Sequence, residues 1–162
     1  MTHDELRFWD AVDRAREGDG RYRREAYGFV VGALGVTVAA LPASRRRDPL
    51  RRHLSGRELL EGIARLAGRE FGFLAPTVFH EWGVHTGEDV GQIVFQLVAM
   101  GQLSVSPEDS VDDFRGFDLA GRLAAPGPAA PRPDVTPGGA SGADPSGSGT
   151  GPGSGSGPEP AR

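Results

Sequence analysis

The stretch TGEDVGQIVFQLVAMGQL, residues 86–103, decides the fold because it carries a complete helix signature. Its apolar side chains recur at the spacing of one face of an α-helix; they are Val90, Ile93, Val94, Leu97 and Val98. Thr86 stands at the N-cap position with Asp89 three residues later, as in a capping box. Gly101 follows the last apolar residues, where glycine commonly ends a helix. The pattern predicts a helix over residues 87–100, whose wide apolar face needs other elements to cover it.

Other segments carry helix signals and would supply that cover. A capping box over residues 2–5 opens a predicted helix that runs to about residue 16. A second helix is expected from residue 23 to residue 41. A capping box at residues 55–58 precedes a helix over 57–71, and Pro76 suits the first turn of a short helix over 76–82.

The end of the folded region shows weaker signals. A last short helix is expected to start at residues 106–109, after which Phe114, Phe117 and Leu119 fold back on the core. Residues 36–38 and 103–105 could each form a short extended piece. The predicted fold class is mostly α: a compact helical domain of four main helices plus short helices, with a possible minor β element and a disordered C-terminal tail.

Residues 26–44 contain no charge, so a membrane-spanning helix has to be weighed. The apolar run over 26–41 would extend about 24 Å at roughly 1.5 Å per residue, against about 30 Å of bilayer hydrocarbon. A helix buried against helices 57–71 and 87–100 is therefore predicted. Gly28 and Gly32, four residues apart, would allow a neighbouring helix to approach closely.

Composition divides the chain at about residue 124. All twelve aromatic residues lie between Phe8 and Phe117, whereas nine of the thirteen prolines follow Ala125. The C-terminal segment is rich in Gly, Pro and Ser and cannot bury enough apolar surface to offset the entropy of ordering it. The sequence predicts a helical globular domain over residues 1–123 and a disordered tail over residues 124–162.

Composition also excludes several kinds of chemistry. The chain has no cysteine, which rules out disulfides, thiol nucleophiles and cysteine-ligated zinc. All eighteen basic residues are arginine, so Schiff-base catalysis and a P-loop lysine are excluded too. The net charge of −4 indicates no particular partner. The N-terminus, MTHDELRFWD, is acidic and amphipathic, unlike a secretory signal. We expect a cytoplasmic location, no membrane partner and no cofactor.

Several stretches resemble the Minf-type family of uncharacterised bacterial proteins. They are HLSGRELLEGIARLA (53–67), FGFLAPTVFHEWGV (71–84), TGEDVGQIVFQLVAMGQLS (86–104) and SPEDSVDDF (106–114), with a weaker match in GRYRREAYGFV (20–30). The resemblance covers about residues 6–119 and leaves the tail outside. It implies a soluble cytoplasmic bacterial domain and carries over no activity, substrate or catalytic residue.

Residues 80–85, HEWGVH, come close to the helix motif of zinc proteases but differ in spacing. That motif places two histidines four residues apart on one helical face. Here the second histidine is five residues on, and Gly83 is expected to end the helix before it. A helix-end histidine in a polar turn is therefore predicted in place of a metal site.

The short helix 76–82, the turn after it and helix 87–100 share the order of a helix-turn-helix, with residues 103–105 as a wing strand. A winged-helix-like nucleic-acid-binding protein is thus the alternative function. Gln92 and Gln96 could read adenine, but Glu88 and Asp89 lie at the N-terminal end, where base contacts are made. Nucleic-acid binders concentrate positive charge on that face, so this alternative is disfavoured.

The densest charge of one sign lies in residues 45–57, which hold six arginines and His53 against one acid, Asp48. The predicted docking surface consists of Arg45, Arg46, Arg47, Arg51 and Arg52. Its target could be a polyanion or the acidic segment 108–113, in the same chain or in a second copy. Paired carboxylates such as Asp112 and Asp113 have no His, Tyr or nucleophile placed with them by spacing. The expected function is a small soluble interaction module for an unknown protein partner, without catalytic activity and with its oligomeric state open.

Overall fold

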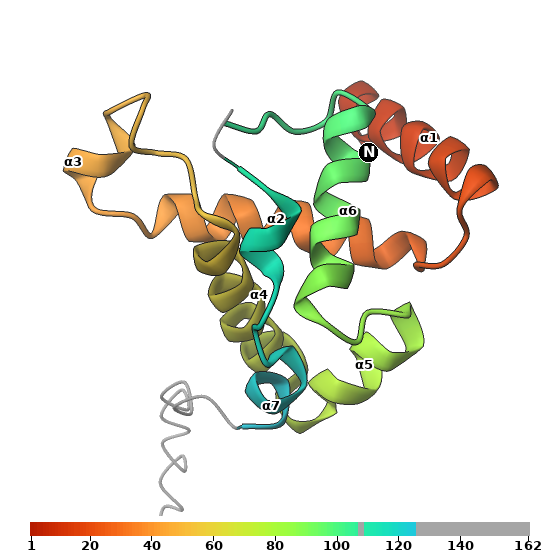
Figure 1. The fold of residues 1–162 in the computed structure, drawn as a ribbon. Helices are drawn as coiled ribbons and strands as arrows, with labels where there is room; N and C mark the ends of the chain where they lie inside the picture. Colours follow the sequence, from red (N-terminus) through yellow and green to blue (C-terminus); the bar gives the residue numbers. More distant parts are fainter. Residues whose placement is uncertain (107–108, 126–162) are drawn as a thin grey trace, which may run out of the picture. The chain divides into compact units, whose positions relative to one another are not determined.

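A computed structural model describes residues 1–106 and 109–125 of the chain. In chain order the elements are α1 (His3–Gly18), α2 (Arg24–Ala39), α3 (Ala43–Arg46), α4 (Gly56–Phe71), the 3-10 helix η1 (Gly72–Leu74), α5 (Ala75–Trp82), α6 (Gly87–Ala99), the 3-10 helix η2 (Val111–Phe114) and α7 (Leu119–Ala124) (Figure 1). The described residues contain no strand, so the mostly α fold class is confirmed. The tail predicted from residue 124 lies, after Ala125, outside the described residues.

The helices predicted with capping boxes begin where those boxes place them. At α6 the hydroxyl of Thr86 accepts the backbone N–H of Asp89, and the Asp89 carboxylate accepts the backbone N–H of Thr86 at 3.0 Å. The same reciprocal pattern opens α1 and α4. Each box satisfies backbone donors that a helix end would otherwise leave without partners.

The core is built around α2, α4 and α6, which contact one another (Figure 1). The apolar stripe of α6 is buried as predicted, with Val90, Ile93 and Leu97 fully enclosed, while Val98 is half-buried. Fully burying one such side chain stabilises the fold by about 1.5–3 kcal/mol. The apolar stripe of α6 therefore faces the core, where α6 contacts α2, α4 and η2.

The uncharged segment forms α2 and packs against α4 and α6, as predicted. None of the helices in the described ranges is long and apolar enough to span a bilayer. A Cβ added at Gly28 would lie 2.6 Å from the Trp9 ring of α1, so this glycine does allow a close approach. The same expectation for Gly32 is wrong, because open space surrounds it. The tightest contact with α4 lies at Gly62, where a Cβ would come 2.0 Å from Thr37 Oγ1.

The possible minor β element is wrong for the described part of the chain. Residues 36–38 stay helical because they belong to the packed α2, where the Thr37 hydroxyl donates to the Ala33 carbonyl at 2.7 Å. Residues 103–105 have no regular secondary structure and join no strand among the described residues. A segment without a neighbouring strand to share its backbone hydrogen bonds forms no sheet.

The predicted start of the last short helix, at residues 106–109, includes residues 107 and 108, which lie outside the described residues. On either side of them, the Ser106 backbone N–H donates to the Asp109 carboxylate at 2.7 Å. A second cap at Ser110 opens η2. Phe114 and Leu119 are buried and Phe117 packs against the core, which confirms that this segment folds back. The helix α7, which the sequence did not predict, follows.

Candidate binding site

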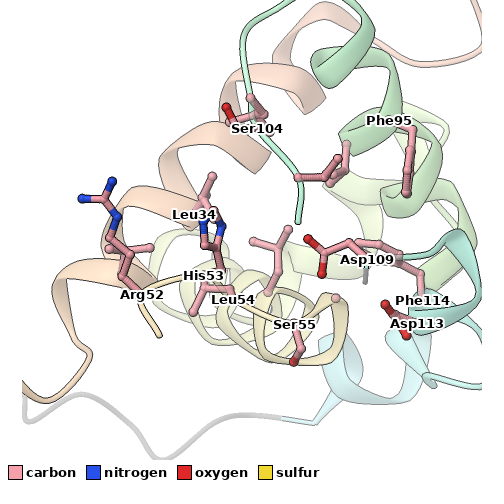
Figure 2. Close-up of a pocket in the computed structure, with 16 residues that line it drawn as sticks. Leu34, Arg52, His53, Leu54, Ser55, Phe95, Ser104, Asp109, Asp113 and Phe114 are labelled. Carbon is pink, nitrogen blue, oxygen red and sulfur yellow. The ribbon is translucent and has the colours of Figure 1, made fainter. Parts of the chain in front are cut away.

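An open cleft of about 320 Å³ lies between α2, α4 and α6 and is closed on one side by residues 103–105 and 109–114 (Figure 2). Its lining is mainly apolar. The apolar lining includes Leu34, Val38, Leu59, Val94, Val105 and Phe114. An apolar concavity of this kind, with a few polar groups at its edge, is the usual form of a binding site.

Phe114 forms part of the cleft wall because two glycines leave room for its ring. A Cβ added at Gly56, in the first turn of α4, would lie 3.0 Å from the Phe114 ring. A Cβ at Gly91, in the middle of α6, would also lie 3.0 Å from that ring. Phe114 is only 4% exposed as a result. The cleft therefore depends on the C-terminal segment packing onto α4 and α6.

Charged side chains stand at the edges of the cleft. Figure 2 shows Arg52 and His53, from the loop before α4, on one side of the cleft. Asp109 and Asp113, from the segment around η2, lie on the other side in the same view. The cleft thus has an apolar interior with a basic edge and an acidic edge.

We call residues 43–53 the basic arm; it begins with α3, which projects from the helices of the core (Figure 1). Arg45, predicted as a docking residue, points back into the molecule. Its Nη2 lies 2.9 Å from Glu58 Oε2, and its guanidinium also donates to the carbonyls of Arg51 and His53 at 2.7 and 3.1 Å. Arg45 therefore braces the basic arm against α4.

The Arg45 guanidinium also changes the acidity of Glu58. Its hydrogen bond, aided by the capping N–H of Ser55, lowers the pKa of Glu58 to about 2, although burial acts in the opposite direction. Glu58 thus has two roles, because it completes the α4 capping box and anchors the basic arm.

The other four predicted arginines differ in their surroundings. Arg46 donates to the Ala39 carbonyl at 3.3 Å, and Arg51 lies 3.9 Å from Asp48. Among the described residues, Arg47 and Arg52 have no carboxylate within ion-pair distance. Of the five, only Arg52 lines the cleft.

The suggested pairing between the arginines and the acidic segment is not seen within residues 1–106 and 109–125. Asp112 instead pairs with its neighbour Arg115 at 3.0 Å, and Glu108 lies outside the described residues. Arg52 and the acids of the η2 segment share the cleft without touching.

The two histidines of HEWGVH do not build a metal centre in the described part of the chain. Gly83 ends α5 with φ +80, as predicted, and His85 lies beyond the helix. The rings of His80 and His85 are 5.1 Å apart, and no third ligand joins them among the residues that the structure places.

In the nucleic-acid alternative, Asp89 would lie close to phosphate. In the structure its carboxylate is instead hydrogen-bonded to groups of the same domain. It accepts the Tyr22 hydroxyl at 2.8 Å and the backbone N–H groups of His85 and Thr86 at 2.9 and 3.0 Å. Burial alone would raise the pKa of Asp89, but these bonds together lower it. Burial, with the bond to Asp89, raises the pKa of Tyr22 to about 12. Gln96 is likewise bonded to Tyr27, which leaves Glu88 and Gln92 on the exposed face of α6.

Comparison of the chain with models of protein families, with curated proteins and with solved structures gave no match. The candidate site therefore has to be interpreted from its own chemistry.

Sequence reasoning missed the cleft because four separate segments assemble it. Helical periodicity identifies the buried stripe of α6, but Phe95, which lines the cleft, falls outside that stripe. Two weak signals were present: the apolar residues Leu103 and Val105 in a loop, and the small residues Gly56 and Gly91 on helix faces. Neither signal could show that these positions meet.

Proposed function

We propose that this chain is a non-enzymatic interaction module that binds a segment of a partner protein in the cleft. The observation that carries the proposal is the cleft itself, where apolar side chains from three helices border open space of about 320 Å³. Covering apolar surface stabilises a complex by about 25 cal/mol per Å². Pockets that accept a large apolar side chain are where interfaces concentrate their binding energy.

The surroundings of the cleft favour a protein segment over a small molecule. Its volume is near the lower limit of small-ligand pockets, about 300 Å³. The surface also continues beyond it onto the basic arm, where Leu50 is 88% exposed. An extended partner could contact the cleft and the arm together, whereas a small ligand would reach only the cleft.

The winged-helix-like alternative has less support. Helix α6, which would enter the major groove, contains no arginine, and its exposed polar side chains are Glu88 and Gln92. Phosphate contacts dominate nucleic-acid affinity and need positive charge at the binding face. The resemblance to the Minf-type family supports a bacterial cytoplasmic protein, and we propose that location.

A peptide selection tests the proposed function. A library of random peptides of about twelve residues, displayed on phage, is panned against the whole chain. We expect enriched peptides to bind wild type and to lose at least about tenfold in affinity, about 1.4 kcal/mol, on Val105→Glu, which puts a charge at the cleft. Val36→Glu is the matched control, because Val36 is similarly exposed, 46% against 37%, and lies outside the cleft lining.

Two results would contradict the proposal. One is the absence of any enriched peptide; the other is equal binding to the wild type and to Val105→Glu. Duplex DNA and single-stranded RNA are tested in parallel at several salt concentrations. Binding that weakens steeply with salt, as counterion release requires, would support the nucleic-acid alternative instead.

A further inference from the structure

We infer that the cleft selects a partner segment in which an apolar anchor lies between an acidic and a basic residue. The acidic residue would face Arg52, and the basic residue would face Asp109 and Asp113. This inference rests on the proposed function, since it names the chemistry of the segment that the cleft would bind. It comes from charge complementarity at the two edges of one apolar site.

The basic edge has one arginine available for a ligand. Glu58, in the first turn of α4, is held by both terminal nitrogens of Arg45. Arg52 has no carboxylate within ion-pair distance among the described residues, and it stands at the edge of the cleft with its guanidinium turned outward (Figure 2). A guanidinium presents several N–H donors in a plane and suits a carboxylate better than any other common side chain.

The acidic edge is held in place by the backbone. Asp109 accepts the Ser106 N–H at 2.7 Å, and Asp113 accepts the Ser110 N–H at 3.0 Å. Both bonds use Oδ2, and they fix the two carboxylates beside the cleft. The nearby Arg115 does not neutralise them, because its ion pair is with Asp112. Two carboxylates at one edge favour a lysine or arginine of the ligand and disfavour an acid there.

The two edges are close enough for one short segment to reach both. A Cβ at Gly56 would lie 3.0 Å from the Asp113 Cβ, which places the acidic edge at the start of α4. His53 at the basic edge precedes Gly56 by three residues, and three residues span at most about 10 Å. An extended ligand covers that distance in about three or four residues. The expected pattern is therefore an acid and a base three to five positions apart, with one or two large apolar residues between them.

The charges alone contribute too little affinity to hold a segment in the cleft, so the apolar interior has to contribute as well. Ion pairs exposed to water contribute about 0.2–1 kcal/mol each, which is about 1.4- to fivefold in affinity. The apolar anchor supplies the larger part of the binding, and the charges decide which segments fit.

The test uses the peptides selected on the wild-type chain and two variants of that chain. Arg52→Gln removes the basic edge. Asp109→Asn with Asp113→Asn removes the charge of the acidic edge but keeps an oxygen for each backbone N–H. We expect each variant to weaken binding by about two- to fivefold, with the loss disappearing at high salt. Arg47→Gln is the matched control, an exposed arginine of the same arm outside the cleft lining.

A double-mutant cycle identifies which charge meets which edge. Replacing the acid of the peptide by its amide should abolish the effect of Arg52→Gln and leave the effect of the two Asn substitutions unchanged. Replacing the base of the peptide by Gln should abolish the effect of the two Asn substitutions and leave the effect of Arg52→Gln unchanged.

The outcomes separate this inference from the proposed function. Peptides that bind the cleft, lose affinity on Val105→Glu and show no acid–apolar–base pattern would overturn the inference and leave the proposed function standing. Coupling of the peptide charges to Arg47, or to neither edge, would also overturn it. If no peptide binds the cleft, both are wrong.

Discussion

Replacing two glycines of α4 by alanine should change stability in opposite directions. Gly62 faces Thr37 of α2, and an added Cβ would lie 2.0 Å from Thr37 Oγ1 and 3.1 Å from its Cβ. Gly68, six residues further along the same helix, has no atom within 4 Å of the corresponding position. The two substitutions share the gain in helix propensity and differ only in the neighbour that the new methyl group meets.

The magnitude follows from that difference. Alanine is favoured over glycine inside a helix by about 0.8–1 kcal/mol, so Gly68→Ala should raise the free energy of unfolding by about that amount. At Gly62 the same gain is opposed by overpacking, which costs about 1–3 kcal/mol. Rotation of Thr37 cannot relieve the clash, because it breaks the bond to the Ala33 carbonyl and leaves the Thr37 Cβ in place. Gly62→Ala should therefore lower the free energy of unfolding by up to about 2 kcal/mol.

Urea unfolding of both variants, followed by circular dichroism, measures the two free energies. Thr37→Ala should restore part of the loss in Gly62→Ala, because it removes both outer atoms of the threonine, and it should leave Gly68→Ala unaffected. Stabilisation of similar size by both glycine substitutions would refute the close contact between α2 and α4. Since Val38 and Leu59 line the cleft beside this contact, the peptide affinity of Gly62→Ala should also fall.

Four further predictions address the Arg45–Glu58 pair, the Tyr22–Asp89 hydrogen bond, the basic arm and the tail. Glu58→Gln keeps the capping oxygen but loses the charge that Arg45 binds. Because the pKa of Glu58 is held near 2 against 4.5, its contribution is complete above pH 4.5 and is lost as the pH falls through about 2. After allowance for solvent screening, we expect the Glu58→Gln variant to be about 1 kcal/mol less stable than wild type at pH 7. In urea unfolding repeated at several pH values, this difference should disappear at the lowest pH. Tyr22→Phe, which removes the bond to Asp89, should cost about 1.5–3 kcal/mol. The pKa of Tyr22 is raised to about 12 from 10, so this contribution is complete below pH 10 and is lost as the pH rises through about 12. The phenolate absorbance of Tyr22 should therefore appear at a higher pH in the folded protein than in the unfolded chain. In thermal unfolding, Arg45→Ser should lower the melting temperature, whereas Arg47→Ser should change stability by less than about 0.5 kcal/mol. Truncation after residue 125 should also leave stability within about 0.5 kcal/mol, and a larger loss would show that the tail packs against the domain.

The sequence predicted the longer helices but neither α7 nor the site, for one physical reason. Helix starts depend on side chains three residues apart, so the caps at Thr86 and Ser55 are visible locally. Two similar Ser–Asp patterns, at residues 106 and 110, follow one another, and the one at Ser110 opens η2. Tertiary contacts decide which of them opens a helix, and a local pattern does not contain them.

The same limit applies to the predicted docking surface. Five arginines in one short segment look equivalent in sequence, yet Arg45 bonds to Glu58, thirteen residues away, and Arg52 lines the cleft. A charge count cannot distinguish a guanidinium that holds the fold together from one that faces a ligand. The cleft itself needed residues from α2 to η2 to be brought together, which periodicity along a single helix does not reveal.

The insertion of Phe114 between Gly56 and Gly91 has a consequence for synthesis. During synthesis, residues 109–114 leave the ribosome after α2, α4 and α6, and until they pack on these helices the cleft lacks one wall. Under the proposed function, the chain binds its partner only after this segment has emerged and packed. A ligand recognises that completed state alone, so at one hundred times its dissociation constant it would oppose release of the segment by about 2.7 kcal/mol. Under the proposed function, partner binding and the packing of Phe114 are thus thermodynamically coupled.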